Sequence, residues 1–200
     1  MSLVFYTNPQ SRGRIARWML EEVGQPYETR VLGYDAMKSA DYLAVNPMGK
    51  VPCVVHNGHV VTEAAAIIAY LAETFPSAGL LPSSDAERAA YYRWMFFAAG
   101  PVEAALTNKA FGFSAPDKSA ALGYGSYEAT ISALEGLLAS SSYVCGSRFT
   151  AADVYVGSHV MWGLMFKTLE PREAFTAYAT RLQEREAYQR GNALDDALMA

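Results

Sequence analysis

In the N-terminal part of the sequence, two predicted helices begin at or just after a polar residue. Ser11 and Arg12 precede one apolar pattern of helical spacing, and Glu63 and Ala64 precede another. The first backbone N–H groups of a helix lack internal partners, and together with the helix dipole they favour a negatively charged group. A carboxylate suits the start of the second helix. The Ser11 hydroxyl either caps the first helix, a common role for serine, or donates a hydrogen bond to a reacting group.

The cysteines and histidines do not form a site by their spacing. Cys53 and Cys145 are too few for a disulfide framework, and with the three histidines they make no zinc pattern. Cys53 follows a proline in a predicted buried strand, where a cysteine is usually a small core residue. We therefore expect no metal ion.

The elements that position these residues follow the order β-α-β-α-β-β-α within residues 1–76. The pattern predicts strands at 3–6, 27–31, 51–55 and 59–61, a helix through Ile15, Met19 and Val23, a weak helix over 35–44 and a third over 62–75. A strand, a helix and a strand in succession favour a parallel pair. The dipeptide Asn57-Gly58 predicts a hairpin between the last two strands.

Only helical patterns follow a linker at residues 77–84. They cover Ser84 toward Asn108, about 124–139, 150–166 and about 172–188, with an end at Gly191. Ser84 with Glu87, and Thr150 with Asp153, have the spacing of N-terminal capping pairs. The sequence thus predicts an α/β domain over 1–76 and an all-α domain over 85–200.

Three motifs, in this order, resemble those of the glutathione transferase family. Residues 46–52 read Asn-Pro-Met-Gly-Lys-Val-Pro, similar to the family's N-P-x-G-x-V-P turn, and residues 62–71 are similar to its E-S-x-A-I helix. Residues 146–153 are similar to its G-x-x-F-T-x-A-D stretch. The resemblance covers nearly the whole chain. It implies a thioredoxin-like domain that binds glutathione as co-substrate and a helical-bundle domain that holds an apolar co-substrate.

The resemblance assigns the central contacts with glutathione to residues 51–52. It implies that the Val51–Pro52 bond is cis and that the Val51 backbone N–H and C=O pair with the cysteinyl part of glutathione. The alternative is an ordinary edge-strand proline. The same resemblance places Lys38 and Lys50 at the glycyl carboxylate, although a lone lysine is usually only solvated.

At the start of the predicted helix over 62–75, the resemblance implies that the γ-glutamyl part of glutathione binds. Glu63 would hold its ammonium group, and the first N–H groups its carboxylate. The sequence departs from the family at Ala64, where a serine hydroxyl usually adds a hydrogen bond. The loss of one hydrogen bond to a charged group costs about 1.5–3 kcal/mol.

The residues around the first helix start would activate the thiol. Asn8-Pro9-Gln10-Ser11 looks like the family's H-P-A-S form, in which serine is catalytic. The resemblance implies that the Ser11 hydroxyl stabilises the glutathione thiolate, since a free thiol with a pKa of about 8.5 is mostly protonated at neutral pH. Tyr6, Asn8 and Arg12 are the other candidates. No cysteine lies in this stretch, which argues against mixed-disulfide chemistry.

In the helical domain, the resemblance implies that Trp94 and Phe97 line the hydrophobic-substrate pocket and that the protein is a homodimer. Net charge is −4, without a basic patch, so nucleic acid is not an expected partner. No apolar stretch approaches the ~20 residues that span a bilayer, and the N-terminus has no signal-peptide pattern. We expect a cytoplasmic detoxification enzyme that conjugates glutathione to hydrophobic electrophiles and also reduces organic peroxides. The alternative is a binding or scaffold protein with weak chemistry.

Overall fold

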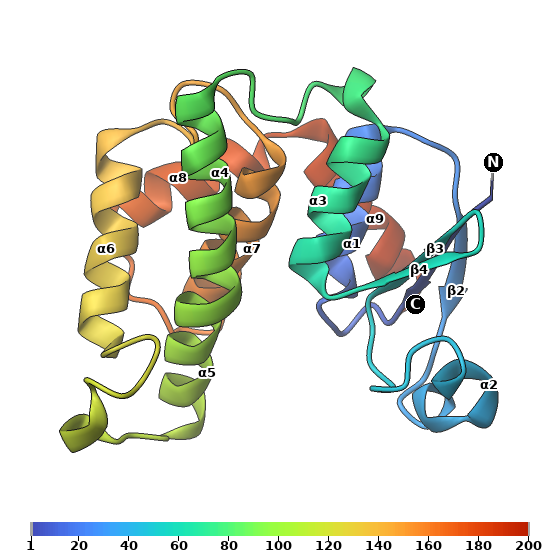
Figure 1. Ribbon diagram of the computed structural model, residues 1–200, viewed down its shortest axis with the longest axis horizontal. Coiled ribbons are helices and arrows are strands. Elements are labelled where there is room, and N and C mark those ends of the chain that lie inside the picture. The colour runs from blue at the N-terminus through green and yellow to red at the C-terminus, as the bar shows by residue number, and fades with distance from the viewer. Residues whose placement is uncertain (1, 200) are drawn as a thin grey trace. The chain divides into compact units, whose positions relative to one another are not determined.

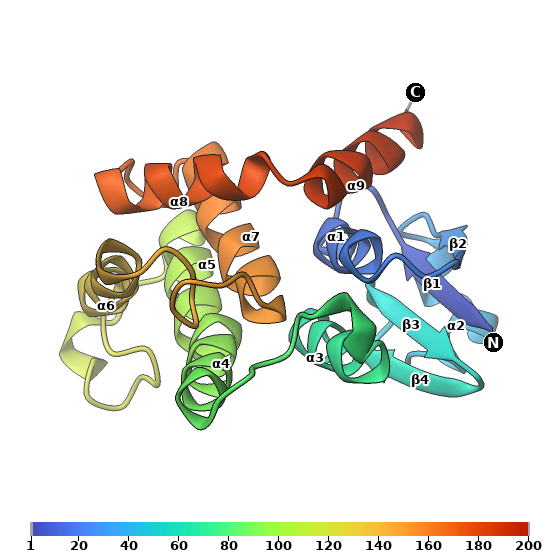
Figure 2. The same ribbon diagram turned by 90° about the horizontal axis from the view of Figure 1, so that it is seen from above.

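The computed structural model describes residues 2–199, which form two compact units. Unit 1 contains the chain up to Gly79 together with the segment from Glu184 onward, and unit 2 contains Leu80–Gln183. In Figures 1 and 2, the C-terminal helix (red) lies against the first helix (blue), and both belong to unit 1. Unit 1 is therefore built from two segments that are far apart in the sequence.

Unit 1 contains a four-stranded mixed sheet. Its strands are β1 (Leu3–Thr7), β2 (Glu28–Val31), β3 (Cys53–His56) and β4 (His59–Thr62), in the order β2-β1-β3-β4. β2 is parallel to β1, whereas β3 is antiparallel to both β1 and β4. The predicted parallel pair and the predicted hairpin are both confirmed. Asn57 and Gly58 turn the hairpin with φ of 50° and 85°.

Helices cover both faces of the sheet. α1 (Gly13–Val23) and α3 (Ala64–Thr74) pack together on one face, and Phe5 of β1 is fully buried there beneath Arg17. Because side chains alternate along a strand, Tyr6 points to the other face. On that side it contacts Tyr42 of the short α2 (Ala40–Leu43), which a 3₁₀ turn (Ala36–Lys38) precedes. A second 3₁₀ turn, Pro76–Ala78, follows α3.

The C-terminal helix α9 (Glu186–Ala197) packs along α1. A buried ion pair joins them, with Arg17 Nε 3.0 Å from Asp195 Oδ1. Gly191 lies directly against α1, where a Cβ would be 3.4 Å from the Trp18 Cα, in van der Waals contact. The sequence predicted one helix over 172–188 within a domain 85–200. The structure instead has α8 (Glu173–Gln183) in unit 2 and α9 in unit 1.

Unit 2 is a helical bundle around α7 (Ala151–Met165), whose residues 151–161 are all buried. The other helices are α4 (Asp85–Phe97), α5 (Glu103–Phe111), α6 (Tyr127–Ser140) and α8, with a short 3₁₀ turn at Pro116–Lys118. A π-helical turn over Ala98–Val102 separates α4 from α5, whereas the sequence predicted one continuous helix toward Asn108. Pro101 lies inside this turn and has no N–H to donate, so the regular hydrogen-bond pattern is interrupted there.

Candidate functional site

The strand register brings three chain segments to one end of the sheet. Tyr6 of β1 pairs with Cys53 of β3, and Cys53 pairs with Thr62 of β4. The chain therefore leaves β1, enters β3 and leaves β4 at the same end. α1 follows β1 and α3 follows β4, so both helices begin there, at their lower ends in Figure 1. Two helix N-termini with positive dipole ends thus meet beside residues 51–52.

The Val51–Pro52 peptide bond is cis, as the resemblance implied. Just before it, the Lys50 carbonyl accepts hydrogen bonds from the Tyr42 hydroxyl at 2.6 Å and from the Asn46 side-chain amide at 2.8 Å. Among residues 2–199, the N–H and C=O of Val51 have no hydrogen-bond partner. The backbone at Val51 is thus fixed from one side and keeps a donor and an acceptor for a peptide-like ligand.

The start of α3 is shaped as an anion site. Glu63 is exposed and has φ 65° and ψ 120°, a conformation that costs a non-glycine residue about 1–3 kcal/mol. No side chain caps the helix, so the first-turn N–H groups that begin at Ala64 face outward from the helix end. Such backbone strain at a helix start with uncapped N–H groups is typical of a binding site.

Ser11 lies in a tight loop at the start of α1. Its Oγ donates a hydrogen bond to the Asn8 carbonyl at 2.7 Å and accepts one from the Gly13 N–H at 3.0 Å. The loop packs closely on β1, because a Cβ on Gly13 would lie 2.0 Å from Thr7 Oγ1. Ser11 is half-buried. Both alternatives that the sequence left open are therefore compatible with its position. Ser11 caps the helix locally, and it lies at the same end of the sheet as the start of β3.

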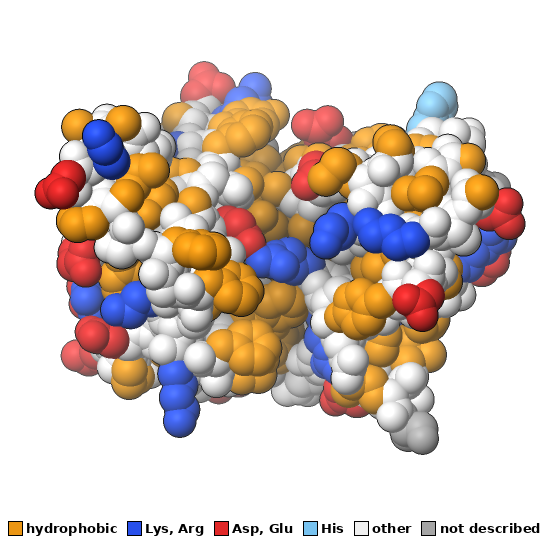
Figure 3. Space-filling model, turned by 90° about the horizontal axis from the view of Figure 1, so that it is seen from below, with side chains coloured by type: hydrophobic (Ala, Val, Ile, Leu, Met, Phe, Trp, Pro, Cys, Tyr) orange, Lys and Arg blue, Asp and Glu red, His pale blue; other side chains and the backbone are white. Residues whose placement is uncertain are grey.

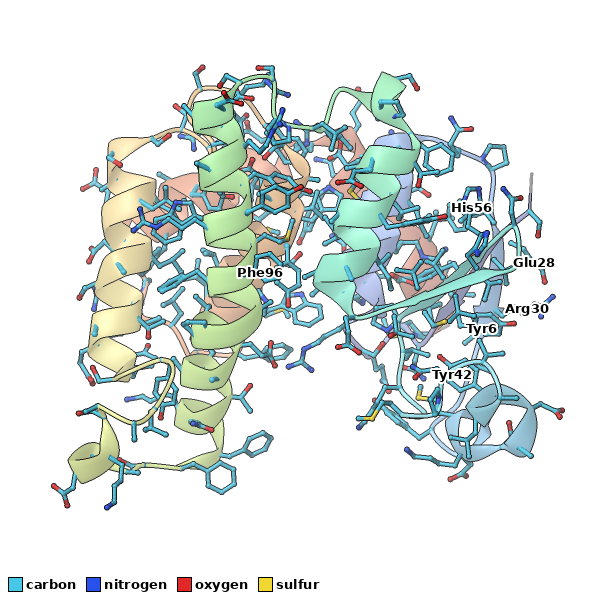
Figure 4. All side chains as sticks on the ribbon, viewed as in Figure 1. Tyr6, Glu28, Arg30, Tyr42, His56 and Phe96 are labelled. Atoms are coloured by element: carbon cyan, nitrogen blue, oxygen red, sulfur yellow. The ribbon has the colours of Figure 1, made fainter. Side chains whose placement is uncertain are left out.

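Two other catalytic candidates have structural hydrogen bonds elsewhere. Asn8 is buried, and its amide donates to the Leu32 carbonyl at 2.9 Å, so it holds the loop to the end of β2. The Tyr6 hydroxyl accepts a hydrogen bond from Arg30 at 3.0 Å, and its ring lies on the face that α2 covers (Figure 4). Arg12, exposed, directly precedes α1. Ser11 and Arg12 lie at the start of α1 itself, and the catalytic roles of all four candidates stay predictions.

The two predicted lysines lie around the turn that precedes Val51. Lys38 Nζ donates to the carbonyls of Met48 and Gly49, at 3.2 and 3.3 Å. Gly49 has φ 57°, and a Cβ there would lie 2.6 Å from the Met37 carbonyl oxygen, so only glycine fits. Lys50 is exposed. Figure 3 shows lysine and arginine side chains among hydrophobic ones on unit 1 when it is viewed from below.

The sequence did not single out Arg14 and Tyr34. Arg14 Nε donates to the Pro9 carbonyl at 2.6 Å, and the Tyr34 hydroxyl donates to the Gln10 carbonyl at 3.3 Å. Both side chains therefore hold the loop that carries Ser11. No local signal marks either residue, because an arginine in a first helical turn and a tyrosine after a strand are both common.

The predicted pocket residues Trp94 and Phe97 lie on α4 in unit 2. Their rings meet edge to face with centroids 5.2 Å apart, and the Arg93 guanidinium lies 4.7 Å from the Trp94 ring centroid. Trp94 is buried and Phe97 is half-buried. Their contact with a co-substrate stays a prediction.

The chemistry of the remaining groups is limited. Burial raises the pKa of the Cys53 thiol to about 11, so this cysteine is a neutral core residue. Within residues 2–199, no His, Cys, Asp and Glu side chains gather in a group of three or more that suits a metal ion. In the same part of the chain, every helix is too short or too polar to cross a membrane.

Known proteins are similar to this chain in both sequence and fold. The profile of the glutathione S-transferase N-terminal domain matches residues 12–74. A glutathione S-transferase of Escherichia coli O157:H7 is 30% identical over 178 residues, which cover 85% of this chain and 87% of the relative. A second glutathione S-transferase, from Xanthomonas campestris pv. campestris, is 31% identical over 165 residues, with coverage of 78% and 80%.

Solved structures give the same result. A glutathione transferase from Methylococcus capsulatus superposes with a TM-score of 0.80 at 26% identity and covers 98% of this chain and 99% of its own. The theta class glutathione S-transferase of Xanthomonas axonopodis pv. citri, solved with glutathione bound, has a TM-score of 0.77 at 27% identity, with coverage of 95% and 96%.

Proposed function

This chain belongs to the glutathione S-transferase family and is a transferase, and we propose that it conjugates the glutathione thiolate to hydrophobic electrophiles with Ser11 as the thiolate-stabilising group. The observation that carries the proposal is the unpaired Val51 backbone between two helix N-termini. A tripeptide binds through a backbone partner and an anion site, and this end of the sheet offers both.

The proposed pose of glutathione follows from that arrangement. The cysteinyl backbone pairs with Val51 beside cis-Pro52. The γ-glutamyl carboxylate meets the first N–H groups of α3 at Ala64, and its ammonium group meets the Glu63 carboxylate. The glycyl carboxylate then lies toward Lys38 and Lys50. This pose directs the thiol to the start of α1.

In the proposed mechanism, the Ser11 hydroxyl turns from the Asn8 carbonyl and donates a hydrogen bond to the thiolate sulfur. The Gly13 N–H, which donates to Ser11 Oγ at 3.0 Å, polarises the hydroxyl and makes it a stronger donor. The hydroxyl and the α1 dipole both favour the anion, which lowers the thiol pKa from about 8.5. The thiol proton goes to solvent. The sulfur lone pair attacks the electrophilic carbon, and the leaving group departs with its bonding electrons.

The same thiolate supports the proposed second activity, reduction of organic peroxides. Trp94 and Phe97 are proposed to contact the apolar co-substrate. We also propose that the protein is a cytoplasmic homodimer with a role in detoxification, as the family resemblance implies. Disulfide exchange is not proposed, because residues 6–12 contain no cysteine.

A scaffold protein that binds glutathione without efficient catalysis is the second candidate. Two observations favour it. Ala64 lacks the serine hydroxyl, and the Ser11 proton is donated to Asn8 in the structure.

Retention on immobilised glutathione, followed by turnover of a generic aryl halide, separates the two candidates. Retention with turnover supports the transferase, and retention without turnover supports the scaffold. Absence of retention and of turnover at millimolar glutathione contradicts both. Glu63→Gln should weaken retention, whereas Glu73→Gln, at an exposed position near the other end of α3, serves as the matched control.

A further inference from the structure

The Arg14 side chain connects the loop that carries Ser11 with the C-terminal helix. Its Nε donates to the Pro9 carbonyl at 2.6 Å, and its Nη2 donates to Asp196 Oδ1 at 2.6 Å. Nη1 lies 3.4 Å from the side-chain oxygen of Asn192. The planar guanidinium thus binds the loop through Nε and α9 through its two Nη groups. Its rigid, planar set of donors can hold both partners at once, whereas a lysine ammonium is a single point charge on a flexible chain.

Arg14 holds the Pro9–Ser11 segment from two sides. The side chain binds the Pro9 carbonyl, and the backbone N–H of Arg14 donates to the Ser11 carbonyl at 3.3 Å. Between the two anchored carbonyl groups lies one further peptide unit, Gln10–Ser11, and the Ser11 side chain leaves the chain there. A rotation of the Pro9 carbonyl would therefore move Ser11 relative to Val51, and a displacement of about 1 Å in a catalytic group can cost about a hundredfold in rate.

We propose that Arg14, held in place by Asp196, is a positioning residue for Ser11, and that α9 takes part in thiol activation through this link. The inference rests on the proposed function. In this arrangement neither Arg14 nor Asp196 touches glutathione. Asp196 orients the guanidinium, the guanidinium fixes the Pro9 carbonyl, and the fixed loop presents the Ser11 hydroxyl to the sulfur.

A through-space electrostatic effect predicts a different sign for one of the two residues. The positive Arg14 would stabilise a thiolate directly, so its loss raises the thiol pKa in either account. The negative Asp196 would oppose a thiolate, so its loss lowers the thiol pKa if charge alone matters. If Asp196 acts by orienting Arg14, its loss raises the thiol pKa. The sign of the change at Asp196 therefore separates positioning from electrostatics.

The experiment measures the pKa of bound glutathione from the ultraviolet absorbance of its thiolate during a pH titration. The full chain is used at saturating glutathione as wild type, Arg14→Met, Asp196→Ala and Asp196→Asn. We expect Arg14→Met and Asp196→Ala to raise the thiol pKa by about 0.5–1 unit, which lowers the acid dissociation constant of the bound thiol about three- to tenfold. Asp196→Asn keeps an acceptor for Arg14 and should stay within a few tenths of a unit of wild type.

Arg190→Ala is the matched control. The Arg190–Glu21 pair joins the same two helices, at 3.3 Å, but makes no contact with residues 9–11. Arg190→Ala should lower the melting temperature about as much as Asp196→Ala and leave the thiol pKa unchanged. Asp196 is 61% exposed, so its variants test the link even where Arg14→Met unfolds the protein.

A thiol pKa that Asp196→Ala leaves unchanged or lowers overturns the inference while the proposed function stands. An equal change in Arg190→Ala also overturns it, because the effect would then report helix docking in general. A wild-type protein that binds glutathione without lowering its thiol pKa contradicts the proposed function itself, and the inference falls with it.

Discussion

At the scale of single residues, the Ser11 hydroxyl has one proton, and the structure directs it to the Asn8 carbonyl at 2.7 Å. If that proton turns to the bound sulfur, Ser11→Ala should raise the thiol pKa. A rise of about one unit corresponds to about 1.4 kcal/mol, and to a loss of turnover of up to about tenfold at neutral pH when the supply of thiolate limits the rate. Activity should partly recover at higher pH, where solvent removes the proton. The pH–rate profile of the variant measures this.

Helix capping alone predicts another outcome for the same variant. Loss of a serine cap costs about 1 kcal/mol of stability and leaves the thiol pKa unmoved. Ser11→Thr keeps the hydroxyl, so it should preserve both the thiol pKa and the helix cap, and it is the control for the two accounts. An unshifted profile in Ser11→Ala would transfer the proposed role to Arg12, the other candidate at the start of α1.

Ala64 provides a second residue-scale prediction. Ala64→Ser restores a hydroxyl beside the first N–H groups of α3, where the γ-glutamyl carboxylate is proposed to bind. A hydrogen bond to a charged group contributes about 1.5–3 kcal/mol, or about 10- to 150-fold in affinity. Calorimetric titration with glutathione measures the change. Ala66→Ser places the same hydroxyl on an exposed face of the helix, so an equal gain there would contradict the proposed pose.

The parts of the site that lie within one short stretch of sequence were predictable. Val51 and Glu63 each lie in a short motif, and the β3–β4 hairpin brings the two motifs together. The contacts of Ser11, Arg14 and Asp196 were not predictable. Whether a hydroxyl donates to the loop or to a ligand depends on rotation about one bond, and the Arg14–Asp196 partners are separated by most of the chain.

At the scale of elements, the start of α4 is held by a network around Glu87. Its carboxylate accepts hydrogen bonds from Arg148 at 2.6 Å and from the Ser83 N–H at 2.7 Å, and Arg148 also donates to the Leu81 carbonyl. The sequence predicted a reciprocal capping box at Ser84. In the structure Ser84 caps the Glu87 N–H, but the Glu87 carboxylate turns to Ser83 and Arg148 instead.

This network predicts a pH dependence of stability. The hydrogen bond from Arg148, followed by that from Ser83, lowers the pKa of Glu87 to about 2 from an ordinary 4.5. Its stabilising contribution is therefore fully present above pH 4.5 and is lost as the pH falls toward 2. Melting temperatures of wild type and Glu87→Gln should differ most above pH 5 and converge near pH 2.

The control for the Glu87 prediction is Asp85→Asn, which removes a charge from the same first turn and none of these hydrogen bonds. An equal loss in both variants, with the same dependence on pH, would show that only the helix dipole is involved.

Element boundaries were predictable where turn chemistry is strong, as at Asn57-Gly58. The break between α8 and α9 was not, because Glu184-Arg185-Glu186 contains no glycine or proline and its residues favour helix. Tertiary packing decides the break: the buried residues Ala187, Gly191 and Asp195 lie against α1. At Gly100-Pro101 the breaker signal was present, and the chain responds with a π-helical turn rather than an end.

At the scale of the whole molecule, glutathione should stabilise the fold. A ligand that binds only the native state contributes about 2.7 kcal/mol at a hundred times its dissociation constant. The melting temperature should therefore rise with millimolar glutathione and stay constant with a tripeptide of unrelated sequence. A curve that does not move would contradict glutathione binding in this chain.

The oligomeric state is a second whole-molecule prediction. Light scattering should give twice the 21.8 kDa of one chain at micromolar concentration. Closed two-fold dimers are the commonest soluble oligomers, and the family resemblance favours one here. A monomer mass at that concentration would contradict this expectation.

The two-part organisation of the molecule followed from composition and from the change of pattern near residue 80. That unit 1 also needs residues 184–199 could not be inferred, because hydrophobic periodicity shows which face of a helix is buried and not which partner buries it.

The docking of α9 on α1 has a consequence for synthesis on the ribosome. The chain up to Gly79 emerges first, but its unit is complete only when the segment from Glu184 onward has followed. At about 5–20 residues per second, the roughly 100 residues between them take on the order of 5–20 seconds. Unit 2 is continuous and needs no such wait. We therefore expect the segment that is translated second to reach its native state first, while the nascent first segment exposes the α1 surface that α9 later covers.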